Sequence, residues 1–153
     1  MAVPDTIKIC REEGYHTDLI GACPDGRQFM AFVTATLPSP LPSDWQAHKR
    51  WYAVLHTFDG NGRHIRTQTA FAGTTADGER DVVSKAQAKL TEFMSHLGEV
   101  AFGDVSIALF SVEVDGHTFG LVDASEPDED YESIHLMPND LAFFDPWDGS
   151  YDT

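Results

Sequence analysis

The last third of this sequence contains no lysine and no arginine. Thirteen of the 25 Asp and Glu residues fall in residues 101–153, whereas all ten Lys and Arg residues precede them, and the formal net charge is −15. Nucleic acids and anionic membranes are themselves negative, so this part of the chain should repel both. We therefore expect no nucleic-acid and no membrane partner, and favour a protein partner with a basic surface. Solubility alone is the competing explanation of these charges.

Cysteines and long apolar runs are also scarce. The two cysteines, Cys10 and Cys23, are too few for a disulfide scaffold. No apolar run approaches the roughly 18 residues that a membrane helix needs. The first residues lack the basic and then apolar pattern of a signal peptide. A chain of 153 residues suits one domain, so we expect a single domain over 1–153 and a cytoplasmic location.

Motifs that define a reaction are absent as well. The sequence has no glycine-rich phosphate loop, no His-Glu-x-x-His, no Cys-x-x-Cys and no Gly-x-Ser-x-Gly. We therefore predict no cofactor and name no catalytic residue. A non-enzymatic protein is the favoured interpretation.

What the sequence does contain begins with three turns. Turn sequences at 25–26, 59–62 and 115–116 each separate two apolar runs. Asp-Gly suits the positive φ angles of tight hairpin turns, so three hairpins are predicted. In the last hairpin a two-residue turn places Val112 opposite Phe119, on one face of the sheet.

One amphipathic helix is predicted between the second and third hairpins, from about Gly78 to Leu97. Asp77 is placed to cap its start, and Gly98 is placed to end it. Apolar residues recur at helical spacing and form one core-facing stripe. This stripe consists of Val82, Ala86, Leu90, Phe93 and Leu97.

These elements predict an α+β fold, an antiparallel sheet of hairpins in the order ββββ-α-ββ with one helix packed on a face. The strand over 51–58 is apolar on both alternating faces, which places it in the sheet centre. The helix covers one face of it. We expect the C-terminal segment 138–153 to pack back on the other.

The C-terminal stretch, FFDPWDGSYDT, combines aromatic and acidic residues. Disordered segments are poor in aromatics, so we expect a folded terminus whose rings pack on the hairpin around 59–62. We also expect Asp145, Asp148 or Asp152 to pair with an arginine of that hairpin. The acidic residues expected to form an interaction surface are Asp128, Glu129, Asp130, Glu132, Asp145, Asp148 and Asp152.

A metal site is the alternative source of function. His56, Asp59 and His64 flank one turn, and imidazole with carboxylate can hold a divalent metal. They would support a metal-assisted enzyme or a divalent-cation-binding protein. The competing interpretation is two ordinary strand histidines and a turn aspartate.

Three stretches, HKRWYAVLHTFDGNGRH, FAGTT and DPWDGSYDT, resemble a family of small bacterial proteins labelled formate hydrogenlyase regulatory proteins. The resemblance runs from YHTDLIG to the terminus and brings no functional residues with it. It implies a regulator that contacts another protein. Together with the charges, it leads us to expect a non-enzymatic regulatory or protein-interaction domain with an acidic binding surface.

Overall fold

The computed structural model describes residues 3–153, which form eleven strands and one α-helix. The strands are β1 (Ile7–Ile9), β2 (Leu19–Ala22), β3 (Gln28–Thr36), β4 (Arg50–Phe58), β5 (His64–Thr74), β6 (Ala101–Phe102), β7 (Val105–Ile107), β8 (Phe110–Val114), β9 (His117–Asp123), β10 (Ser133–Met137) and β11 (Leu141–Phe144). The helix α1 spans Glu79–Ser95, and single 3-10 turns span Trp45–His48 and Thr75–Asp77.

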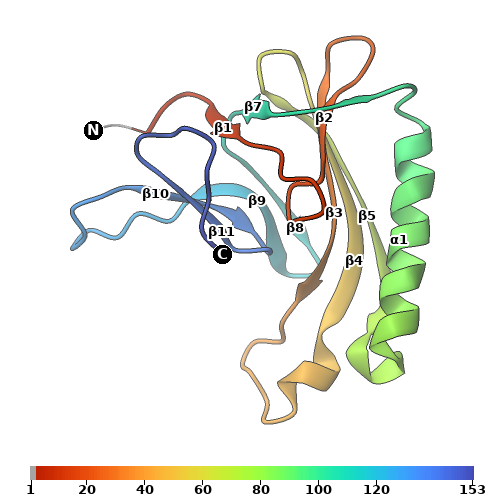
Figure 1. Cartoon of the computed structure of the whole chain (residues 1–153). Coiled ribbons are helices and arrows are strands. Elements are labelled where there is room, and N and C mark those ends of the chain that lie inside the picture. The colour runs from red at the N-terminus through yellow and green to blue at the C-terminus, as the bar shows by residue number, and fades with distance from the viewer. Residues whose placement is uncertain (1–2) are drawn as a thin grey trace.

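The strands form three antiparallel sheets (Figure 1). The largest has five strands in the order β5-β4-β3-β2-β6, the second has four in the order β11-β10-β9-β8, and β1 pairs with β7. Helix α1 lies along one face of the five-stranded sheet, and the four-stranded sheet lies on its other side (Figure 1). The predicted class, antiparallel sheets with one helix, is confirmed.

The finer order of four strands, one helix and two strands is not confirmed, because residues 3–153 form eleven strands in three sheets. Strands β1, β6 and β7 have three residues or fewer, too short for the alternation that identifies a strand in a sequence. Strands β10 and β11 lie in the acidic segment that follows the last predicted hairpin. That segment therefore contributes two strands to the four-stranded sheet.

Strand β4 lies inside the five-stranded sheet, between β3 and β5, as its two apolar faces predict. Ala53 and Leu55 join a core that also contains the buried stripe of α1. Tyr52, Val54 and Phe58 join a second core, between the two large sheets. Each face of β4 is thus covered by a different layer.

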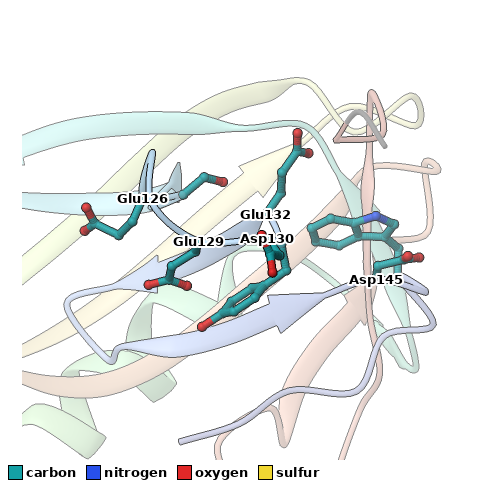
Figure 2. Close-up of a pocket in the computed structure, with 8 residues that line it drawn as sticks. Glu126, Glu129, Asp130, Glu132 and Asp145 are labelled. Atoms are coloured by element: carbon teal, nitrogen blue, oxygen red, sulfur yellow. The ribbon is translucent and has the colours of Figure 1, made fainter.

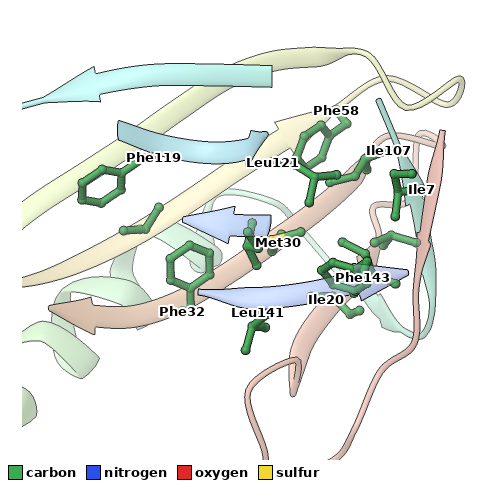
Figure 3. Close-up of a cluster of buried hydrophobic side chains, with 14 of the residues drawn as sticks. Ile7, Ile20, Met30, Phe32, Phe58, Ile107, Phe119, Leu121, Leu141 and Phe143 are labelled. Carbon is green, nitrogen blue, oxygen red and sulfur yellow. The ribbon is translucent and has the colours of Figure 1, made fainter. Parts of the chain in front are cut away.

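The core between the sheets is built from segments far apart in the sequence (Figure 3). Met30 and Phe32 come from β3, Leu121 comes from β9, and Leu141 and Phe143 come from β11. All five are buried. The four-stranded sheet and its C-terminal strand therefore provide most of the cover that this face of β4 needs.

The aromatic residues of the C-terminus belong to this same core. Phe143 is only 1% exposed, and Trp147 and Tyr151 pack against the cluster while partly buried. The Tyr151 hydroxyl lies 3.2 Å from the Thr17 hydroxyl, and the Cys10 amide donates to the Gly149 carbonyl at 3.0 Å. These contacts tie the end of the chain to the segment between β1 and β2.

The predicted pairing of a C-terminal aspartate with an arginine is wrong. No ion pair among residues 3–153 joins Asp145, Asp148 or Asp152 to an arginine. Arg50, the arginine that begins β4, is 3.5 Å from Asp115. The Asp115 carboxylate also accepts a 2.7 Å hydrogen bond from the Tyr52 hydroxyl. The acidic partner of Arg50 is therefore supplied by the β8–β9 turn and not by the C-terminal segment.

The predicted β8–β9 hairpin and the helix are present. Val112 lies opposite Phe119, as the two-residue turn requires. Along α1 the residues Val82, Ala86 and Leu90 are buried. The predicted capping role of Asp77 is wrong, because Gly78 occupies the capping position. The Asp77 carboxylate instead accepts hydrogen bonds from the amide and hydroxyl of Thr74.

Truncating Phe58 to alanine should cost about 3–5 kcal/mol of unfolding free energy, since its ring is fully buried at the end of β4. Urea unfolding measures the loss. Phe102→Ala is the matched control, because that ring is 48% exposed and its removal opens no enclosed cavity. A loss below about 1 kcal/mol for Phe58→Ala would contradict the buried position of this strand.

Candidate functional site: an acidic cavity beside the β9–β10 loop

A cavity of about 390 Å³ opens beside the loop that joins β9 to β10 (Figure 2). Carboxylates from this loop occupy one side of it, and Asp145, just beyond β11, lies on the other (Figure 2). The side chains that line the cavity are Ser125, Glu126, Glu129, Asp130, Tyr131, Glu132, Asp145 and Trp147. Below, the acidic cavity means this set of residues.

Local hydrogen bonds close the loop at its base and within it. The Ala124 amide donates to the Ser133 carbonyl at 2.9 Å, and the Ser133 amide donates to the Ser125 hydroxyl at 3.1 Å. The Glu129 amide donates to the Glu126 carbonyl at 3.1 Å. These bonds form a compact loop with both ends at the sheet, so its acidic side chains are held close together.

Trp147 reaches the cavity through a separate turn. Its amide donates to the Phe144 carbonyl at 2.9 Å, so the chain reverses directly after β11. Pairing of β10 with β11 brings this turn beside the loop, since Ser133 lies opposite Phe144. An aromatic wall from the C-terminus thereby faces carboxylates from the β9–β10 loop.

The structure brings together four of the seven predicted surface residues. Glu129, Asp130, Glu132 and Asp145 line the acidic cavity. Asp128, Asp148 and Asp152 do not line it.

Two of these three are engaged elsewhere in the chain. The Asp148 carboxylate accepts hydrogen bonds from the hydroxyl and amide of Ser150, and this bonding lowers the pKa of Asp148. The backbone of Asp152 pairs with Ala142.

Sequence reasoning missed the other lining residues. Glu126 and Tyr131 belong to the same acidic stretch, EPDEDYE, and could have been included from their proximity. Ser125 is adjacent to this stretch but is not acidic, and Trp147 lies far from it in the sequence. Trp147 is fifteen residues or more from the loop, and only the pairing of β10 with β11 places it there.

The electrostatics of the acidic cavity favour a cation. No lysine or arginine lines it. The Glu132 Oε2 atom is buried and has no hydrogen-bond partner within residues 3–153. Hydrogen bonding to the Glu129 carboxylate, followed by the charge of that group, raises the pKa of Tyr131. A positively charged donor in the cavity would bond these carboxylates, and the lining residue Trp147 is the side chain best suited to cation–π contact.

The two histidines proposed for a metal site meet at a threonine. His56 Nδ1 and His64 Nε2 each lie 2.7 Å from the Thr67 hydroxyl oxygen. His56 is fully buried, and its Nε2 atom has no partner in the described part of the chain. Burial first, and the charge of His64 second, lower the pKa of His56 to about 3. His64 stacks on Phe110 with a centroid distance of 4.6 Å.

Asp59 is not part of this arrangement. Its carboxylate accepts hydrogen bonds from the amides of Asn61 and Arg63, at 2.9 Å and 3.0 Å, and so shapes the β4–β5 turn. Within residues 3–153, no group of three or more His, Cys, Asp or Glu side chains is arranged to hold a metal ion. The structure therefore does not join the three candidates at one position.

Comparison with known proteins identifies no family for this chain. A scan against family models and searches of curated proteins and of solved structures find no match to this chain. Within the described residues, no helix has the length and apolar character needed to cross a membrane. The interpretation of function therefore depends on the geometry of the chain itself.

Proposed function

We propose that this protein is a non-enzymatic, cytoplasmic regulatory domain that binds a basic segment of a partner protein in the acidic cavity. The observation that carries the proposal is a concave site with five carboxylates, an aromatic wall and no basic side chain. Lysine and arginine are the protein groups that satisfy such a site, because they bring charge and several donors together.

Two features support a basic side chain over a diffuse charge effect. The Oε2 atom of Glu132 is a buried acceptor without a hydrogen-bond partner within residues 3–153. A donor that bonds to it does not have to displace a water molecule from this oxygen, so more of the hydrogen-bond energy contributes to binding. The rings of Tyr131 and Trp147 line the same cavity and offer apolar surface to the methylene stem of a lysine or arginine. Net charge alone would require neither feature.

A fluorescein-labelled decapeptide of alternating lysine and arginine is expected to bind the full chain at 150 mM salt, as measured by fluorescence anisotropy. Replacing three lining carboxylates, in Glu129→Gln, Asp130→Asn and Glu132→Gln, should weaken binding at least about tenfold, since each lost charge-assisted hydrogen bond is worth about 1.5–3 kcal/mol. A peptide of alternating glutamate and aspartate should not bind.

The matched control removes the same three charges elsewhere, in Glu79→Gln, Asp81→Asn and Glu99→Gln, all on exposed positions outside the cavity. It should change the affinity for the peptide by less than about threefold, because at this salt concentration charges more than about 8 Å from the bound peptide are largely screened. Equal weakening by both triple variants would mean that the peptide responds to net charge only. That result, or no binding at all, would remove the support for the proposal.

A further inference from the structure

Strand β3 is longer than its neighbour β2, and the difference leaves one side of β3 open. The pairing of β2 with β3 ends at Leu19 opposite Ala31, whereas the pairing of β4 with β3 continues to Thr36. Residues 32–36 therefore have a strand on one side. On the other side, no strand formed by residues 3–153 pairs with them.

The hydrogen-bonding pattern identifies the groups that face the open side. The Cys23 amide donates to the Arg27 carbonyl at 2.7 Å, so Arg27 directs its backbone groups toward β2. Backbone direction alternates along a strand, so Val33 and Ala35 also direct N–H and C=O to that side. Within the described chain, neither residue has a backbone hydrogen bond there.

Neither Val33 nor Ala35 is fully covered by another layer. Within residues 32–36, Val33 and Ala35 are partly exposed, while Phe32, Thr34 and Thr36 are buried. The two residues that carry the free backbone groups are therefore partly accessible to solvent. An unpaired strand edge of this kind is a template for another strand.

A cavity of about 410 Å³ lies at the beginning of this open edge. Leu19, Val33 and Leu90 contribute apolar surface, and His16 and Asn139 contribute polar groups. The Oδ1 atom of Asn139 is buried and lacks a hydrogen-bond partner within residues 3–153. The site thus combines a free strand edge, an apolar wall and an unused acceptor.

We propose that this edge binds an extended segment of a partner protein, which adds to the five-stranded sheet as a short strand beside residues 33–35. The free groups of Val33 and Ala35 lie about 7 Å apart along the strand, the repeat at which an added strand presents its own donors and acceptors. Main-chain bonds supply the affinity in this mode of recognition, and pockets for alternate side chains supply the specificity. Asn139 Oδ1 accepts one further donor from the bound segment. This site is separate from the acidic cavity, and no residue lines both.

Amide hydrogen exchange of the free chain gives the first test. The amides of Val33 and Ala35 should exchange much faster than those of Phe32 and Thr34, which bond to β4. Equal protection of all four amides would show that the edge is already covered and would overturn the proposal. Protection of Val33 that rises with protein concentration would assign the edge to a second copy of the chain, and would overturn it equally.

The second test uses a displayed library of random twelve-residue peptides, selected against the full chain. Selected peptides should protect the Val33 and Ala35 amides. They should bind Val33→Pro at least about tenfold more weakly, because proline removes the free donor. Proline is tolerated where the missing N–H faces away from the ladder, so the fold should persist. Val33→Ala, which keeps the donor, should bind within about threefold of wild type.

If Val33→Pro does not fold, binding of the selected peptides to two further variants tests the proposal. Asn139→Leu should weaken the selected peptides, and the triple carboxylate variant of the acidic cavity should bind them as wild type does. If the proposed function is wrong, the basic peptide will not bind the acidic cavity. The binding of the selected peptides to the edge of β3 will be unaffected. An empty selection, or peptides that protect β5 in place of β3, would overturn the proposal.

Discussion

Removing residues 143–153 should cost more than about 5 kcal/mol of unfolding free energy and leave no cooperative thermal transition. The buried ring of Phe143 alone accounts for about 3–5 kcal/mol. Trp147 and Tyr151, which pack against the same core, are lost with it. Their removal also opens the core between the sheets to water. Circular dichroism during heating, with urea unfolding as a second probe, measures the result.

The control separates the rings from the charges of this segment. A variant with Asp145→Asn, Asp148→Asn and Asp152→Asn keeps every ring, and none of these carboxylates forms an ion pair in the described structure. Its stability should stay within about 1 kcal/mol of wild type, as is usual for surface charges. A truncated chain that melts within a degree or two of the full chain would show that the terminus is no part of the core.

Acid should destabilise the protein through His56. The folded chain holds the pKa of this residue near 3, mainly because the ring is buried, whereas an unfolded histidine titrates near 6.5. The unfolded chain therefore binds the extra proton between these two values. The contribution of neutral His56 to the free energy of unfolding is complete above about pH 6.5 and decreases as the pH falls. The expected loss is about 2–3 kcal/mol at pH 4.5 and up to about 5 kcal/mol near pH 3.

Urea unfolding of wild type and His56→Leu at pH 7.0 and pH 4.5 measures this effect. Carboxylates titrate in both chains, so the difference between their pH dependences isolates the histidine. The leucine variant should lose about 2–3 kcal/mol less on acidification. His48→Leu is the matched control, since that side chain is 53% exposed, and it should follow wild type. Identical pH dependences for wild type and His56→Leu would contradict the buried, neutral state of His56.

Much of the fold follows from local patterns. Asp25-Gly26, the turn over 59–62 and Asp115-Gly116 predict three hairpins that the structure contains. Helical spacing of Val82, Ala86 and Leu90 predicts the buried face of α1. These signals succeed because turn conformation and amphipathic periodicity depend on neighbours within a few residues.

The features that the sequence did not predict depend on contacts between segments far apart in the chain. The sequence indicated that a second layer had to cover Val54 and Phe58, but it did not show that β8–β11 form most of that layer. An arginine of the hairpin around 59–62 was predicted to pair with a C-terminal aspartate, yet Arg50 lies 3.5 Å from Asp115 in the β8–β9 turn. Ion pairs between segments depend on where each side chain points after packing, which no local pattern records.

The sequence by itself determined the class of fold, the double-faced central strand and the concentration of acidic residues in 101–153. Only the tertiary structure decided which carboxylates share a cavity with Trp147, that His56 and His64 meet at Thr67, and that β3 has an open edge beyond Ala31. The reason is physical. Composition and periodicity act along the chain, whereas cavities and free strand edges arise from the relative lengths and packing of elements that the chain brings together from distant positions.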